Sequence, residues 1–186
     1  HKYRLRWSNA NDPETWTAAD YVDIDKGDHG DYITGLCPMG DRLLVFKSNS
    51  VYAVFGFDSD SFQVVTLSND VGSVPLSSPV ATPYGAFFWY ADRGVYLYNR
   101  EGFVWIFDKL SPAVDDGRVT FGSNPQLAWG NNKLYVTVDW TEDGSTTRRT
   151  LIYDPTIAGG AWITTNIDAA AVYAYKPPNS SSTVYG

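Results

Sequence analysis

The chain has 186 residues and a formal net charge of −7. An acidic surface is repelled by phosphate backbones, so nucleic acid is not expected as a partner. Hydrophobic residues make up 44% and aromatic residues 16% of the chain, while charged residues make up 19%, below the ~25% of an average domain. Because no apolar run reaches the length of a membrane-spanning helix, we expect a globular, β-rich chain without a membrane span.

The chain contains a single cysteine, Cys37, so no intrachain disulfide can form. No basic residue stands beside it in the sequence to lower the pKa of its thiol. We therefore expect Cys37 to be a small buried apolar residue rather than a reactive thiol.

Residues 85–105 form the most informative stretch of the chain. They read as three short aromatic-rich strands joined by glycine-bearing turns at 91–94 and 99–102, as expected for a half-buried sheet. A related stretch at 40–56 lies 44 residues earlier, counted between Tyr52 and Tyr96 (96 − 52). Strand repeats of ~40–45 residues are typical of β-propeller blades. We therefore predict an all-β fold of the β-propeller class, with four-stranded antiparallel blades.

We predict that residues 1–186 form one propeller-like domain. The polar segment 141–147 is expected to be the longest hairpin loop. The expected parts are a half-blade at 2–24, full blades at about 32–67, 78–110 and 126–167, and a partial blade at 169–186.

The two incomplete blades allow two interpretations of the blade count. The terminal parts could together complete one blade and close a ring of about four blades. Alternatively, the chain is a fragment of a larger propeller, which is the interpretation that we favour because the chain begins without Met and stops within an apparent strand.

Aromatic residues recur at a nine-residue interval on successive strands. Paired across a hairpin, such residues pack ring against ring. We accordingly expect Trp16, Trp105 and Trp162 to be mostly buried. The pairs are Trp7 with Trp16, Tyr96 with Trp105, and Tyr153 with Trp162.

No catalytic motif stands out, and the chain is predicted not to be an enzyme. Neither histidine belongs to a nucleophile motif, and no phosphate-binding glycine loop or zinc spacing is present. The best candidate for a ligand is an acidic loop, whose alternating carboxylates could bind Ca²⁺. A solvated turn between blades is the alternative, and we favour it. The candidate metal ligands are Asp23, Asp25, Asp28 and Asp31.

Two tryptophans, Trp129 and Trp140, flank a strand of the third blade and are candidates for stacking on a sugar. Packing between blades is the alternative and the commoner fate of such rings. Residues 9–16 are also similar to the Asp-box of sialidase-like propellers, although only Thr15 and Trp16 match it fully. In that family the box braces a hairpin and is not catalytic.

Several short motifs together resemble the propeller-type virion structural proteins of tailed bacteriophages, which are found in tail hubs and nozzles. The likeness covers residues 4–108 and is weaker in the third blade. The residues that carry it are Arg4 to Ser8, Pro13 to Trp16, Tyr21 to Ile24, Ile33 to Leu36, Leu43 to Lys47, Ser50 to Tyr52, Phe87 to Trp89 and Asp92 to Tyr96.

The resemblance implies a non-enzymatic assembly scaffold in a phage tail, made in the host cytoplasm. Its implied partners are other virion or tail proteins and further copies of itself in a ring. The alternative function is a glycan-binding or sialidase-like glycan-cleaving propeller involved in recognition of a host receptor. That alternative requires an exposed Trp129 or Trp140 beside converging carboxylates or arginines.

Overall fold

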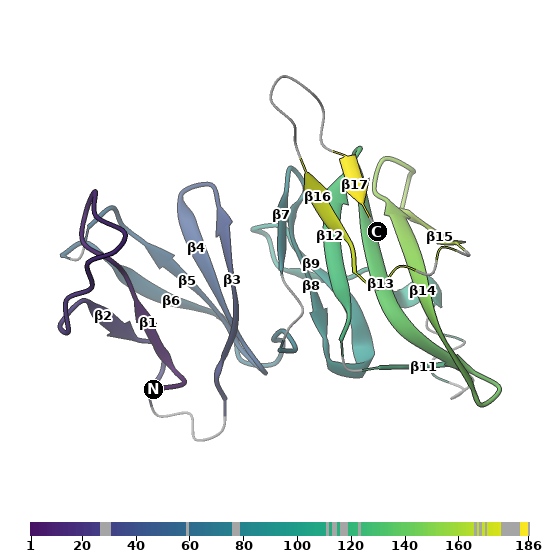
Figure 1. Cartoon of the computed structure of the whole chain (residues 1–186), viewed down its shortest axis with the longest axis horizontal. Helices are drawn as coiled ribbons and strands as arrows, with labels where there is room; N and C mark the ends of the chain where they lie inside the picture. The colour runs from purple at the N-terminus through teal and green to yellow at the C-terminus, as the bar shows by residue number, and fades with distance from the viewer. Residues whose placement is uncertain are drawn as a thin grey trace. The chain divides into compact units, whose positions relative to one another are not determined.

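The computed structural model divides the chain into two compact units, residues 1–73 and 74–186. It describes residues 1–26, 31–58, 60–75, 79–110, 112, 115, 119–122, 124–165, 167, 169, 171–175 and 183–185. The fold is all-β, as predicted, and every paired strand in the described residues runs antiparallel to its neighbours (Figure 1). Among the described residues the strand pairings define separate sheets, so the propeller and the single domain stay predictions.

Unit 1 consists of a two-stranded sheet and a four-stranded sheet. The four-stranded sheet has the order β3-β4-β5-β6, so each strand pairs with the next one along the chain. It lies in the segment for which the first full blade was predicted. The strands are β1 (Arg4–Arg6), β2 (Tyr21–Asp23), β3 (Ile33–Met39), β4 (Arg42–Lys47), β5 (Val51–Phe55) and β6 (Gln63–Ser68).

Unit 2 contains a four-stranded sheet, order β10-β9-β8-β7, and a five-stranded sheet in which β12 and β11 both pair with β13. A last pair, β16 with β17, follows. The elements are β7 (Val80–Thr82), β8 (Gly85–Tyr90), η1 (Ala91–Arg93), β9 (Gly94–Tyr98), β10 (Phe103–Trp105), η2 (Asp108–Leu110), β11 (Val119–Phe121), β12 (Gln126–Gly130), β13 (Lys133–Glu142), β14 (Ser145–Asp154), β15 (Ala161–Thr165), β16 (Tyr173–Tyr175) and β17 (Thr183–Tyr185).

A cluster of aromatic rings forms the core of unit 2. Trp89 on β8 contacts Phe107 and Phe121 edge to face, with ring centroids 5.5 and 5.2 Å apart. Phe107 also contacts Trp162 at 5.0 Å, and the Trp162 indole N–H donates to the Ile106 carbonyl over 2.8 Å. These rings come from both large sheets of the unit, so the cluster joins the two sheets through edge-to-face contacts.

The nine-residue interval is confirmed at two of its three copies. Tyr96 lies directly opposite Trp105, and Tyr153 lies directly opposite Trp162. Both tryptophans are partly buried. The third copy is wrong, because Trp16 is 55% exposed in the irregular segment before β2.

Trp7 takes a different aromatic partner in unit 1. Its ring meets Phe62 edge to face, with centroids 4.9 Å apart. A hairpin that pairs Trp7 with Trp16 would require a strand at 15–16. The segment just before it favours a turn, because Pro13 has no backbone N–H for a strand ladder and Asn11 has a φ of 61°. The segment therefore turns instead of returning as a strand.

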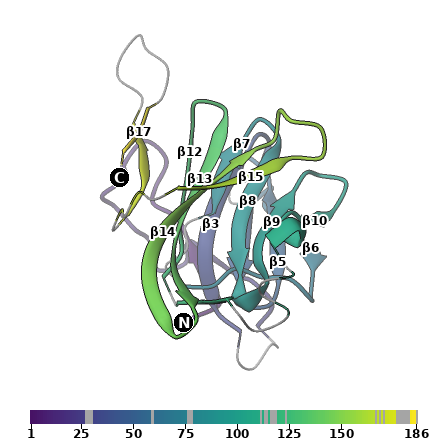
Figure 2. The same ribbon diagram turned by 90° about the vertical axis from the view of Figure 1, so that its right-hand side faces the viewer.

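The predicted long loop at 141–147 is also wrong. β13 and β14 continue to Glu142 and Ser145, which lie opposite each other. The turn is only Asp143-Gly144, with φ values of 51° and 75°. Both positive angles suit the two-residue turn that matches strand twist. A hairpin of two ten-residue strands therefore forms, and it curves strongly (Figure 2).

Candidate functional site

The acidic loop does not assemble a metal site among the described residues. The Asp23 carboxylate accepts two hydrogen bonds from the Arg4 guanidinium, at 2.6 and 3.1 Å. Asp25 instead accepts from the Tyr52 hydroxyl at 2.9 Å, and its backbone carbonyl accepts from the buried Lys47 ammonium at 3.3 Å. These two carboxylates are therefore directed to protein donors on different strands.

Asp31 is 3% exposed and fixes the turn between β4 and β5. Its carboxylate accepts from the Ser50 hydroxyl at 2.6 Å and from the backbone N–H groups of Asn49 and Tyr32 at 3.2 and 3.1 Å. A buried carboxylate needs such donors to offset the loss of hydration. In the described part of the chain no group of three or more His, Cys, Asp or Glu residues is placed to hold a metal ion, so the predicted Ca²⁺ site is not formed by these three aspartates. Asp28 lies outside the described residues.

The two candidate stacking tryptophans have different environments. Trp140 is only 6% exposed, with the Arg149 guanidinium 5.1 Å from its ring centroid and the Phe121 ring at 5.9 Å. It therefore has no open face for a sugar. Trp129 on β12 is partly buried and packs against Phe87 at 5.9 Å.

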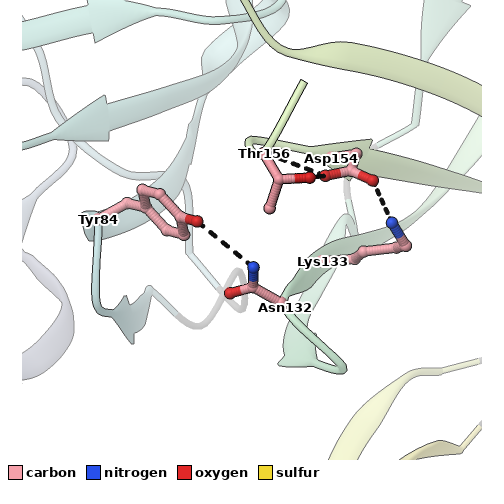
Figure 3. Close-up of polar contacts among 5 residues, drawn as sticks. All are labelled: Tyr84, Asn132, Lys133, Asp154 and Thr156. Carbon is pink, nitrogen blue, oxygen red and sulfur yellow. Dashed lines mark hydrogen bonds and ion pairs between the residues drawn. The ribbon is translucent and has the colours of Figure 1, made fainter. Parts of the chain in front are cut away.

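A polar group surrounds the turn that follows Trp129. Asn131 and Asn132 have φ values of 51° and 59°, which gives a two-residue turn between β12 and β13. The Asn132 amide donates to the Tyr84 hydroxyl at 3.4 Å, and the Tyr84 ring meets Trp129 edge to face at 5.8 Å (Figure 3). These contacts join the β7–β8 turn to the β12–β13 turn.

Next to this turn, Asp154 at the end of β14 is 7% exposed. It pairs with the Lys133 ammonium, and it accepts from the Thr156 hydroxyl at 2.6 Å and backbone N–H at 3.0 Å (Figure 3). The hydrogen bond from Lys133, followed by those from Thr156, lowers the pKa of Asp154 from 3.8 to about 2. These contacts tie the end of β14 to the start of β13, and we interpret the group as a structural clamp.

The depressed pKa predicts a specific loss of stability in acid. A carboxylate whose folded pKa is below its unfolded value stabilises the fold above the unfolded value, and this contribution disappears as the pH falls. Asp154 should lose its stabilising contribution as the pH falls from 3.8 to about 2. We expect Asp154→Asn to destabilise unit 2 at neutral pH and to show a smaller decline across this window, measured by chemical unfolding at several pH values.

The matched control is Asp143→Asn, which changes an exposed aspartate in a turn of the same sheet. Its acid profile should follow that of the unchanged protein. Equal acid profiles for Asp154→Asn and the unchanged protein would contradict the clamp.

Cys37 is buried, as predicted, with 1% exposure and no disulfide partner. Burial raises the pKa of its thiol to about 11. The thiolate is the reactive form, so this burial disfavours reaction of Cys37 at neutral pH.

Unit 1 carries a groove that the sequence did not reveal. It encloses about 400 Å³, and Arg6, Asp41 and Arg42 are the charged residues at its edge. Phe57 stands at the rim and is 99% exposed. One sequence signal was available: Phe57 lies between Gly56 and Asp58 in a polar turn, where a large apolar side chain is unusual. The apolar lining is Leu5, Trp7, Leu36, Leu43, Val54 and Phe62.

One edge strand of each large sheet exposes branched apolar residues. Among the strands that the structure describes, β6, β10 and β15 each end a sheet and pair with one other strand. The residues are Val64 and Val65 on β6, Val104 on β10 and Ile163 on β15, with exposures of 36%, 44%, 44% and 48%.

No protein-family model matches this sequence, and no curated protein is detectably similar to it. Within the described residues, no helix is long and apolar enough to cross a membrane.

Proposed function

We propose that this chain is a non-enzymatic structural subunit of a bacteriophage virion, a tail component that acts through contacts between subunits. The observation that carries the proposal is the recurrence of exposed β-branched residues on the outer strands β6, β10 and β15. Soluble monomers usually protect such edges with charges, prolines or covering loops. Edges that stay open and apolar are suited to pairing with another chain.

The exposed positions on the first two sheets are related by the repeat. Val65 lies opposite Ala53, and Val104 lies opposite Leu97. Ala53 and Leu97 are 44 residues apart (97 − 53), which equals the offset between Tyr52 and Tyr96. The same apolar outer position is thus offered by successive sheets, as expected of a subunit that makes repeated lateral contacts.

We also propose that the sheets are blades of a β-propeller. The support is the succession of sheets whose strands, apart from β11, pair in chain order, together with the 44-residue offset. The phage-like motifs noted above favour a position in a tail assembly. A rigid disc of blades would present its outer strands, including β6 and β10, to neighbouring subunits.

The test asks whether the protein is present in purified phage particles. Particles from the source culture are banded by density, and their proteins are quantified by mass spectrometry. We expect peptides of this chain at a fixed ratio to tail proteins. Native mass spectrometry of disassembled tails should show the chain within a larger complex.

Edge variants test the observation itself. Val65→Lys together with Val104→Lys should lower incorporation into particles about tenfold or more, because a lysine on an edge strand opposes strand pairing. The control Ile157→Lys changes an exposed residue outside the strands. Absence of the chain from banded particles, or specific binding of a glycan with Trp129 as the stacking ring, would overturn the proposal.

A further inference from the structure

Phe57 follows β5 and presents a large apolar side chain from a segment with several local hydrogen bonds. Phe57 is 99% exposed. Its backbone N–H and that of Asp58 donate to the Ser61 hydroxyl oxygen at 3.0 and 3.1 Å, and the Ser61 N–H donates to the Asp58 carboxylate at 2.9 Å. Gly56 has φ +122°, and a side chain there would lie 2.7 Å from the Ser61 carbonyl. These contacts anchor the backbone of Phe57 and Asp58 to Ser61, while the Phe57 ring extends into solvent.

An apolar groove that could bind a phenyl ring lies next to Phe57. The groove of about 400 Å³ is lined mainly by apolar side chains of β1 and of the four-stranded sheet. An apolar cavity of roughly 150 Å³ is enough to bind benzene, so a phenylalanine side chain fits. Leu36 on β3 lines the groove and is 46% exposed. The groove is thus open to a side chain that arrives from outside.

The charges around the two features are complementary. Phe57 is followed in its turn by two acidic residues, Asp58 and Asp60. The groove has two arginines, Arg6 and Arg42, and one aspartate, Asp41, which pairs with Arg42 at 3.1 Å. If this turn met the groove of another copy, its carboxylates would face a groove edge with an excess of positive charge, and the attraction would favour that orientation.

We propose that unit 1 binds a second copy of this chain by reciprocal exchange of Phe57, each ring entering the groove of the other copy. A ring and a groove that share one rim form a self-complementary patch, which is what a two-fold symmetric contact requires. The proposal rests on the proposed function in that both involve subunit assembly. It uses a different surface, because Phe57 and the groove do not involve Val65, Val104 or Ile163.

The test is sedimentation equilibrium of the purified 186-residue chain over a concentration series. Phe57→Ser removes the ring, and Leu36→Glu blocks the groove. Each should raise the dimer Kd about a hundredfold, because two anchor contacts of the kind that dominates interfaces are lost together. Ile157→Ser changes an exposed apolar residue in unit 2 and should leave the Kd unchanged. Added salt should weaken the dimer of the unchanged chain.

A mixing experiment separates the proposed contact from other causes of dissociation. Phe57→Ser retains an intact groove, and Leu36→Glu retains an intact ring. Mixed in equal amounts, the two variants should form a heterodimer through one ring and one groove, although neither dimerises well alone. Circular dichroism and thermal unfolding should match those of the unchanged chain, since both residues lie outside the buried core.

Three results would overturn the inference: a chain that stays monomeric at every concentration, a dimer unaffected by Phe57→Ser, or variants that fail to complement. The outcome is distinguishable from failure of the proposed function. If the dimer is lost in the Val65→Lys and Val104→Lys protein but kept in Phe57→Ser, the outer strands form the dimer contact and the groove does not. If the chain is found in particles but is monomeric in solution, the Phe57 exchange is wrong and the proposed virion role is still supported.

Discussion

Trp89→Ala is expected to lower the free energy of unfolding of unit 2 by about 3–5 kcal/mol, the usual range for truncating a buried large aromatic residue. Trp89 is 1% exposed on β8, and its ring contacts Phe107 and Phe121. Its indole N–H donates to the Ala91 carbonyl at 2.6 Å. The substitution therefore leaves a cavity between the two large sheets and removes the hydrogen-bond donor that fixes the turn after β8.

The measurement is equilibrium unfolding in urea, followed by far-ultraviolet circular dichroism. The control is Trp16→Ala, because Trp16 is 55% exposed and its main polar contact is a hydrogen bond to the Pro13 carbonyl. It should change stability by less than about 1 kcal/mol. Similar losses for both variants would show that the aromatic cluster around Trp89 does not hold the sheets together.

Gly85→Ala is expected to destabilise unit 2 by about 3 kcal/mol or more, because strain and overpacking act together. Gly85 begins β8 with φ +137°, where a side chain is strained. An added Cβ would lie 2.1 Å from the Tyr98 carbonyl oxygen and 3.0 Å from a Leu97 methyl carbon. The first of these neighbours is backbone in the paired strand β9, so relief requires separating β8 from β9.

Gly102→Ala is the matched control, since Gly102 lies in a turn of the same sheet and a Cβ there meets nothing within 4 Å. That variant should unfold close to the unchanged protein. The comparison uses the same urea titration for both variants. If Gly85→Ala proved as stable as Gly102→Ala, the close approach of β8 to β9 would be wrong.

The sheet pattern could be predicted because it depends on local chemistry. Alternation of aromatic and branched residues indicated the strands, and glycine-bearing turns such as 99–102 indicated where they end. The Asn99 side chain accepts from the N–H groups of Glu101 and Gly102 at 3.2 Å each, a contact within four residues. The pairs Tyr96–Trp105 and Tyr153–Trp162 follow from such turns, because a turn of known length sets the register of its hairpin.

The acidic loop shows why the candidate site could not be predicted in the same way. Spacing alone brings Asp23, Asp25 and Asp31 near one another along the chain. The fold gives each a separate set of donors, from Arg4, from Tyr52 and from Ser50. These donors are 19 to 27 residues distant in sequence, so only the tertiary structure determines whether carboxylates meet one another or protein donors.

The sequence by itself determined the all-β class, most of the strands and the repeat, because backbone geometry and turn chemistry act over a few residues. It misplaced the segment at Trp16 and the turn at 143–144. Only the tertiary structure decided which rings are covered. Trp16 is exposed, Trp140 is buried and Phe57 stands beside an apolar groove, although all three occur in similar aromatic and polar surroundings in the sequence. Burial depends on which distant side chains close over a ring, and the contacts that cover it come from other strands.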